Sequence, residues 1–319
     1  MTDHSLILDA DLAGRTGAEW MDTLEDVAEE HGYFEPLGPD HQAVFLAAGP
    51  RLLVTFEDAE TICKTPSGEP RSFDYAREYG WSVLSIISNS ESWFRHPAIY
   101  QFFDKLTDEG TFDSFDDVLF FGAGGAGYAA AAYSVAAPGA RVLALRPQAT
   151  LSAQIAAWDT RHIAHRRHDF TSRYGFAPDM VEAAEAAYLV YSPMQKADAI
   201  HAALFTRPNV MPLRVPGIGG RIEQSLDQIG VMDGLLQAAM DGALSPAAFR
   251  RLIQPIKGYG TYVRTLHKRA MDTGHPQLAA NLAAAMLRDG PDTFFEGKLA
   301  EHAAQGVVPR PATAASAAE

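Results

Sequence analysis

Cysteine and positive charge are both scarce in this chain. Only one of the 319 residues is a cysteine, Cys63, which excludes an internal disulfide framework and a cysteine-rich metal site. Lys and Arg number 26 against 40 Asp and Glu, so the formal net charge at pH 7 is −14. An acidic protein repels phosphate groups, and we therefore expect binding neither to nucleic acid nor to an anionic membrane surface. Any anion site has to be local.

Targeting and membrane-spanning signals are lacking as well. Residues 1–14 are acidic and have no basic segment followed by an apolar stretch, so we expect no secretory signal and predict a cytoplasmic protein. Residues 118–140 carry no charge, but they include five glycines and Pro138. This composition favours a buried strand followed by a tightly packed helix over a membrane span.

Short apolar runs recur along the first two thirds of the chain. They lie around Val44 and begin at Leu52, Ser82, Val118, Arg141, Tyr188 and Asn209. Most are separated by segments long enough for a helical crossover, which predicts an α/β protein with a doubly wound, mainly parallel sheet. Residues 16–31 have helical apolar spacing, with Thr16 as N-cap and Gly32 after the end, and residues 97–109 predict a helix begun by proline.

Residues 118–127, VLFFGAGGAG, read as a strand, a glycine turn and a small-residue helix. Gly122, Gly124 and Gly127 match G-x-G-x-x-G, the dinucleotide fingerprint in which a helix N-terminus faces a pyrophosphate. Such folds usually place an acidic residue after the next strand for the ribose hydroxyls, whereas this chain has Leu145 and Arg146. This interpretation therefore favours NADP, and an NADP-dependent oxidoreductase is one alternative function.

The same segment also resembles a nucleophile elbow. GAGGAGYAA and the later VLALRPQATL resemble α/β-hydrolase-fold proteins of bacterial surface-glycan loci, whose elbow reads like GSSMGGYAA. The resemblance plausibly covers residues 52–226. It implies that Gly124 stands at the nucleophile position, that the Gly125 amide belongs to the oxyanion hole, and that a second donor comes from the loop near Ser88 to Ser90, including Asn89.

The other catalytic positions of this resemblance are also degenerate. The acid position holds Ser192, with Asp198 as the nearest carboxylate, and Gly220 stands where a histidine is expected. Loss of nucleophile and base together removes the proton-transfer couple that activates a serine. The resemblance therefore implies a pseudo-hydrolase.

The resemblance also implies a domain organisation. We expect an N-terminal helical segment (1–40), an α/β-hydrolase-like core (41–225) with a helical, lid-like insert at about 150–187, C-terminal helices with a helical hairpin (226–305), and a disordered tail (306–319).

A glycine turn at a helix N-terminus offers backbone N–H groups to an anion. The predicted vestigial pocket comprises Gly122, Gly124, Gly125, Gly127, Asn89 and Arg146. The alternative is that these glycines only permit close packing of the helix on the sheet.

The segment 161–173 is the one strongly basic cluster. Arg161, His165, Arg166 and His168 are predicted anion contacts. We expect no metal there, because histidines at i, i+3 and i+6 drift across a helix face instead of converging. Asp198 and His201 lie three residues apart, which predicts a surface contact on one helix.

The sequence thus predicts a non-catalytic α/β-hydrolase-like protein without a cofactor. Its ligand would be a small anionic metabolite, a glycan precursor or a protein partner held by the helical hairpin, which suits a role in polysaccharide biosynthesis. A second alternative is a divergent hydrolase with a relocated nucleophile among Ser88, Ser90 and Ser92. For that serine the sequence identifies no histidine or lysine as proton acceptor.

Overall fold

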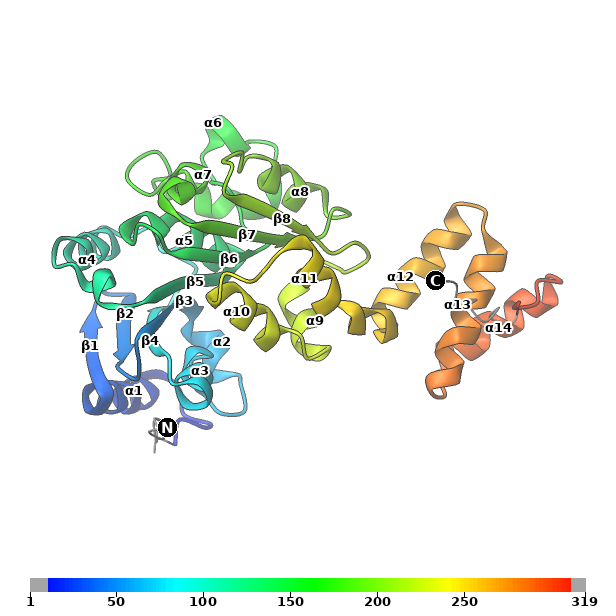
Figure 1. Cartoon of the computed structure of the whole chain (residues 1–319), viewed down its shortest axis with the longest axis horizontal. Helices are drawn as coiled ribbons and strands as arrows, with labels where there is room; N and C mark the ends of the chain where they lie inside the picture. The colour runs from blue at the N-terminus through cyan, green and yellow to red at the C-terminus, as the bar shows by residue number, and fades with distance from the viewer. Residues whose placement is uncertain (1–10, 311–319) are drawn as a thin grey trace.

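The computed structural model describes residues 11–310, and within them the strands form one mixed sheet (Figure 1). The order across the sheet is β1-β2-β4-β3-β5-β6-β7-β8. β2 pairs antiparallel with both β1 and β4, and all other pairs are parallel. The strands are β1 (Gly32–Pro36), β2 (His41–Leu46), β3 (Arg51–Asp58), β4 (Ser82–Ser88), β5 (Asp117–Ala123), β6 (Arg141–Leu145), β7 (Ala186–Tyr191) and β8 (Val210–Arg214).

Helices cover both faces of this sheet (Figure 1). The helices of the core are α1 (Gly17–His31), α2 (Ala59–Cys63), α3 (Ser72–Tyr79), α4 (Pro97–Asp108), α5 (Gly125–Tyr133), α6 (Ala153–Ala156), α7 (Ala177–Met180), α8 (Lys196–Ala203), α9 (Ile222–Gln228), α10 (Met232–Met240) and α11 (Pro246–Leu252). Short 3₁₀ turns add η1 (Thr111–Ser114), η2 (Ser134–Ala136), η3 (Thr160–Arg167), η4 (Val181–Ala183) and η5 (Gln254–Gly258).

Side chains that alternate along the central strands build one hydrophobic core on each face. On β5, Leu119 and Phe121 join the core beneath α1, α3, α9 and α10, whereas Phe120 joins the core beneath α4 and α5. Alternation follows from the two-residue period of a strand. Burial on both faces explains why the sequence shows these strands as continuous apolar runs.

Each of the seven apolar runs forms a strand, β2 to β8, and the predicted helices are present as α1 and α4. The N-terminal segment was predicted to be helical only, which is wrong, because residues 32–36 add β1 to the edge of the sheet. The segment 150–187 was predicted to be a long helical insert, but it contains only α6, η3, α7 and η4, all short. It has no sustained apolar period that a long helix could bury.

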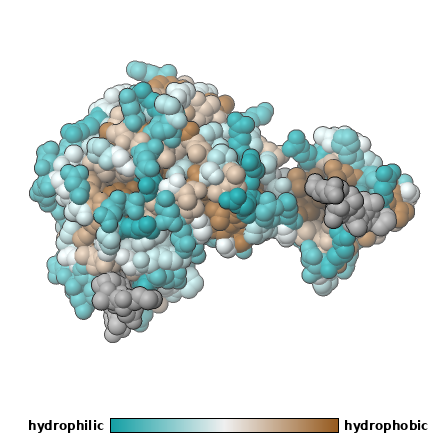
Figure 2. Space-filling view, in the orientation of Figure 1, coloured by the Kyte–Doolittle hydropathy of each residue, from teal (hydrophilic) through white to brown (hydrophobic). Residues whose placement is uncertain are grey.

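The C-terminal helices α12 (Gly260–Asp272), α13 (Pro276–Asp289) and α14 (Thr293–Ala304) stand to one side of the sheet (Figure 1). They have a small core of their own around Val263, Ala283 and Phe295. Figure 2 shows apolar and polar residues mixed over the visible face of these helices and of the sheet-containing part. None of the helices within residues 11–310 combines the length and apolar character of a bilayer span.

The described part of the predicted disordered tail is held against α13. Gln277 Nε2 donates to the Val308 carbonyl (2.8 Å), and the Arg310 N–H donates to Asn281 Oδ1 (2.9 Å). Residues 306–310 are therefore ordered here, contrary to the prediction, and residues 311–319 lie outside the described part of the chain.

Candidate functional site

The glycine turn between β5 and α5 has the shape of an elbow. Gly124 has φ 60° and ψ −122°, a conformation in which a side chain is strained. A Cβ on Gly122 would lie 2.2 Å from the Ala126 carbonyl oxygen, and one on Gly127 would lie 3.1 Å from the Leu145 carbonyl oxygen. Gly122 and Gly127 therefore serve close packing of α5 against the sheet.

The guanidinium of Arg146 covers the nucleophile position of this elbow. A Cβ on Gly124 would lie 3.1 Å from Arg146 Nη1 and 3.3 Å from Cζ. Arg146 in turn forms a two-pronged ion pair with Glu223, Nε to Oε2 at 2.8 Å and Nη2 to Oε1 at 2.6 Å. Burial disfavours the charged guanidinium, but the Glu223 carboxylate outweighs it and raises the pKa of Arg146. An ion pair thus fills the space in front of the position where the resemblance places a serine.

A cavity of about 470 Å³ opens beside the elbow. It is lined by residues from four segments: Glu57, Asp58, Glu60, Thr61 and Lys64 at and after the end of β3, Ser88, Ser90, Glu91, Ser92, Trp93 and Phe94 at and after the end of β4, Ala123, Gly124, Gly125 and Ala126 at the elbow, and Arg146, Gln148 and His162 beyond β6. The end of β3 borders the elbow because β3, not β4, is the neighbour of β5.

Some of the residues predicted to form the pocket line this cavity, and others do not. Gly124, Gly125 and Arg146 line the cavity, as do Ser88 and Ser90 of the loop in which a second donor was expected. Asn89 does not line it: its side chain is exposed and its N–H donates to the Asp40 carbonyl at 2.8 Å.

Hydrogen-bond acceptors dominate the cavity wall. Four of the lining side chains are carboxylates, and burial raises the pKa of one of them, Glu57. The amide oxygen of Gln148 is fully buried and has no donor among the described residues. Of the two lining Arg and Lys side chains, Arg146 is paired with Glu223 and Lys64 with Glu60. A ligand that donates hydrogen bonds would therefore complement this wall better than one that only accepts them.

Of the degenerate triad positions, only Gly124 lines this cavity, and Ser192, Asp198 and Gly220 do not. Ser192 is buried directly after β7, and its Oγ has no partner among the described residues. Gly220 is exposed, with no atom within 4 Å of where its Cβ would be. Neither residue lines the cavity.

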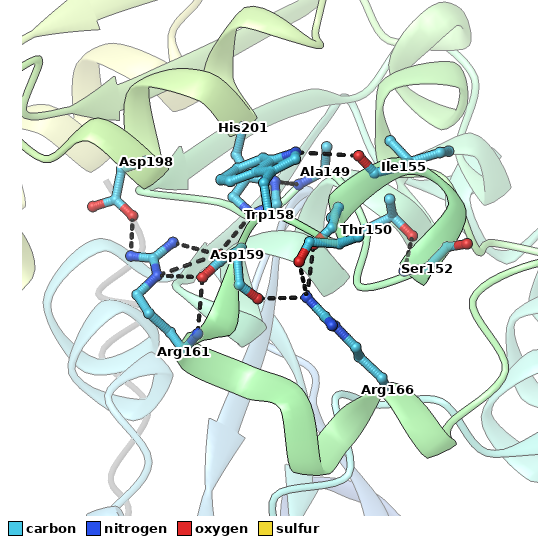
Figure 3. Close-up of polar contacts among 12 residues, drawn as sticks. Ala149, Thr150, Ser152, Ile155, Trp158, Asp159, Arg161, Arg166, Asp198 and His201 are labelled. Atoms are coloured by element: carbon cyan, nitrogen blue, oxygen red, sulfur yellow. Dashed lines mark hydrogen bonds and ion pairs between the residues drawn. The ribbon is translucent and has the colours of Figure 1, made fainter.

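Asp198 belongs to a buried polar network (Figure 3). Its carboxylate accepts from Arg161 Nη1 at 2.6 Å, and Arg161 also binds the Asp159 carboxylate. His201, fully buried, contacts Asp159 Oδ2 through Nε2 at 3.0 Å, and its Nδ1 accepts from the Ala149 N–H. The surface contact predicted between Asp198 and His201 is therefore wrong, because each residue faces a different partner in the interior.

Two carboxylates share one cation in this network, because burial lowers the pKa of His201. Burial alone would raise the pKa of the Asp159 carboxyl, but Arg161 and His201 outweigh burial and hold it well below its usual range. Asp159 and Asp198 are both nearly fully buried, and Arg161 is the cation that they share. The network connects the start of η3 to α8 beside the cavity.

Three of the four predicted anion contacts already have protein partners. Arg161 binds Asp159 and Asp198, Arg166 Nη2 donates to the Ala156 and Asp159 carbonyls, and His165 Nε2 lies 2.6 Å from Glu91 Oε2. Anion binding by this segment, with His168 as the fourth contact, stays a prediction. Within residues 11–310, no three His, Cys, Asp or Glu side chains converge as metal ligands.

One pair at the cavity was missed by sequence reasoning. His41 Nε2 lies 2.5 Å from Ser92 Oγ, and Ser92 lines the cavity. The two residues are 51 positions apart, so no local motif signals the contact. They meet because β2 runs antiparallel to β4 with His41 opposite Ser88. Burial, and then the nearby His96, lower the pKa of His41 to about 4, so its imidazole is neutral at pH 7.

The dinucleotide interpretation finds little support in the fold. The doubly wound dinucleotide fold has the strand order 3-2-1-4-5-6, whereas this sheet has an antiparallel β2 between β1 and β4. Arg146, which suggested a 2′-phosphate, is bound to Glu223.

Comparison with protein-family models and with curated protein sequences found no match. Among solved structures, an esterase from Pyrobaculum calidifontis is similar over 66% of this chain and 88% of its own, with 13% identity and a TM-score of 0.42. The capsule O-acetyltransferase of Neisseria meningitidis serogroup A matches 64% of this chain and 94% of its own, with 8% identity and a TM-score of 0.43.

The glycosylation-associated Gap123 complex from Streptococcus agalactiae contains a chain that matches 64% of this one and 45% of its own, with 13% identity and a TM-score of 0.42. These likenesses concern the fold alone. With its mainly parallel sheet, the helices on both faces and the strand, glycine elbow and helix at its centre, the chain has an α/β-hydrolase-like fold.

Proposed function

We propose that the protein binds a small, neutral, hydroxyl-rich molecule, such as a glycan precursor, in the cavity beside the elbow. In this proposal the elbow itself performs no serine-hydrolase chemistry, because Gly124 offers no nucleophile and the Arg146 guanidinium covers it. Of the ligands that the sequence suggests, the glycan precursor suits this cavity better than an anionic metabolite does.

One observation carries this choice of ligand. The cavity wall carries the four carboxylates of Glu57, Asp58, Glu60 and Glu91 against only two Arg and Lys side chains. A sugar hydroxyl can donate to a carboxylate oxygen and adds no charge to this wall. A phosphate or sulfate group brings only further acceptors and negative charge to the same wall.

The cavity size suits such a ligand. Small-molecule sites usually have volumes of ~300–1,000 Å³, and this cavity has about 470 Å³. The hydroxyl-bearing residues Thr61, Ser88 and Ser90 also line it, and the Thr61 and Ser88 hydroxyls already donate to Asp58 Oδ1 and to the Ser90 carbonyl.

Isothermal titration calorimetry with neutral oligosaccharides, their phosphorylated counterparts, sulfate and NADPH tests the proposal. We expect a neutral sugar to bind at least about tenfold more tightly than its phosphorylated counterpart, equivalent to about 1.4 kcal/mol. Ser90→Tyr should abolish this binding, because the new ring enters the cavity from an exposed lining position. Asn89→Tyr is the matched control, since Asn89 is exposed next to it and does not line the cavity.

Tighter binding of NADPH or of the phosphorylated sugars would contradict the proposal. So would equal loss of binding in the Ser90→Tyr and Asn89→Tyr proteins, because the effect would then come from the loop in general.

A further inference from the structure

We propose that Ser92 and His41 form a relocated nucleophile and base in this cavity, and that the protein cleaves acyl esters of hydroxyl-rich compounds there. The inference rests on the proposed function, because the ester must enter the same cavity. The sequence identified no proton acceptor for the serines after β4, and we propose His41 for that role.

The first support is the geometry of the pair. Ser92 Oγ lies 2.5 Å from His41 Nε2, within the distance that a base needs to take a hydroxyl proton. Ser92 is the one cavity-lining serine whose hydroxyl contacts a histidine among the described residues. Its Oγ also accepts from the Phe94 N–H at 3.1 Å, while Ser88 Oγ, 3.0 Å away, donates its own proton to the Ser90 carbonyl.

The second support is backbone strain immediately after Ser92. Trp93 has φ 57° and Phe94 has φ 55°, and both side chains are buried. Positive φ is uncommon for bulky aromatic residues and is energetically unfavourable. Strain of this kind gathers at sites where a residue has to be presented in one orientation. Here the turn presents Ser92 to the cavity, as the elbow glycine would present a serine at residue 124.

His41 is in the protonation state that a base requires. Burial is the main cause of its lowered pKa, His96 and His168 lower the value further, and Asp40 opposes them. The imidazole is therefore neutral at pH 7. For Nε2 to accept the Ser92 proton, the ring proton has to sit on Nδ1, which is buried and has no partner among the described residues. No carboxylate orients the ring, so the pair is a dyad.

The proposed reaction is a two-step hydrolysis. Ser92 Oγ bonds to the acyl carbon of the ester while its proton passes to His41 Nε2, and the ester C–O bond breaks with that proton delivered to the leaving alkoxide. A water molecule then attacks the acyl-serine, gives its proton to His41 and releases the acid, and the proton returns to Ser92 Oγ. The balance is ester plus water to acid plus alcohol.

Donors for the developing oxyanion border the same cavity. Gly125 and Ala126 belong to the first turn of α5, where backbone N–H groups have no helical acceptor. The ring of Trp93 packs against Gly125, which keeps the strained turn beside this end of α5. The elbow thus retains its donors and lies next to the new nucleophile.

Active-site labelling with a fluorophosphonate tests the inference on the full-length protein. We expect one adduct, mapped to Ser92 by peptide mass spectrometry, which is absent from Ser92→Ala. Asn89→Ala is the matched control, because Asn89 lies in the same loop but is exposed and does not line the cavity, and it should be labelled like the unaltered protein. His41→Gln should slow labelling by ~10²–10⁴-fold.

A second variant covers the case in which His41→Gln does not fold. In Ser92→Cys, the new thiol should react with iodoacetamide faster than Cys63, because the neighbouring imidazole promotes the thiolate. Burial raises the pKa of the Cys63 thiol, so that cysteine is an internal reference.

The outcomes separate this inference from the proposed function. Absence of an adduct in folded protein, or an adduct at another serine, overturns the dyad even if neutral sugars bind in the calorimeter. A Ser92 adduct in a protein that binds no sugar overturns the ligand class and leaves the dyad standing.

Discussion

The carboxyl ends of β5 and β4 bring different groups to the cavity. The end of β5 has the glycine elbow and the N-terminus of α5, but Gly124 carries no side chain and Arg146 covers it. The end of β4 has no such elbow, yet it holds a serine against a histidine and a strained turn after them. One strand, β3, lies between these two ends in the sheet.

This comparison teaches that a motif and a site are different things. The elbow motif is local, because tight packing between β5 and α5 requires small residues whether or not chemistry occurs there. The Ser92–His41 contact joins the loop after β4 to the start of β2, which are distant in sequence. A fold resemblance therefore locates the cavity, and side-chain contacts decide what it can do.

The largest expected effect concerns the β4 end and its dependence on pH. The pKa of His41 is about 4 in the folded protein against an ordinary value of 6.5. The unfolded chain takes up the proton first as the pH falls, so stability present above pH 6.5 is lost between pH 6.5 and 4. This loss amounts to about 3 kcal/mol. Urea unfolding of the unaltered protein and of His41→Gln across this range measures it.

The difference between the two proteins isolates His41, because the other buried histidines are present in both. A His41→Gln protein that loses as much stability as the unaltered one between pH 6.5 and 4 would show that His41 does not titrate this way.

A smaller effect is expected at the β5 end. Glu223→Ala leaves the half-buried Arg146 guanidinium without its carboxylate. We expect the free energy of unfolding to fall by about 1–3 kcal/mol. This value is lower than for a fully buried pair, because water screens the charges of a partly exposed one. The double variant Arg146→Leu with Glu223→Leu should recover most of this loss, because no charge is left unpaired. Chemical denaturation of both variants measures the difference. Equal stability of the single and double variants would argue that the ion pair has no structural role.

The smallest effect tests whether the elbow can be repaired. Gly124→Ser puts a side chain at φ 60° against the Arg146 guanidinium, and we expect a loss of about 1–2 kcal/mol. We also expect no fluorophosphonate adduct at residue 124, since no histidine contacts it. A rapid adduct at residue 124 would contradict this expectation, because it would show that the β5 end lacks only a serine.

Most of the sheet was predictable from sequence because buried parallel strands appear as apolar runs. β1 was missed, since five residues between Gly32 and Pro36 show no such run and gain their strand conformation from pairing with β2. The lid-like insert was predicted as helical, but its order comes from contacts such as Arg166 with backbone carbonyls instead of from helical periodicity.

The site was predictable only at the elbow. Gly124, Gly125 and Arg146 meet because they end adjacent parallel strands or begin the helix between them, which the order of motifs already implies. The partner of Arg146, Glu223, comes from α9, and Asp198, which binds Arg161, comes from α8. Ion pairs across such distances leave no trace in one sequence.

The sequence by itself determined the α/β class, the glycine elbow, the absence of a serine at residue 124 and the acidic surface, since each depends on residue types or on neighbours within about ten positions. Only the tertiary structure decided that Arg146 is neutralised by Glu223 and that His41 faces Ser92. The physical reason is the antiparallel pairing of β2 with β4, whose register is set by burial of both strands and places two residues 51 positions apart in hydrogen-bond contact.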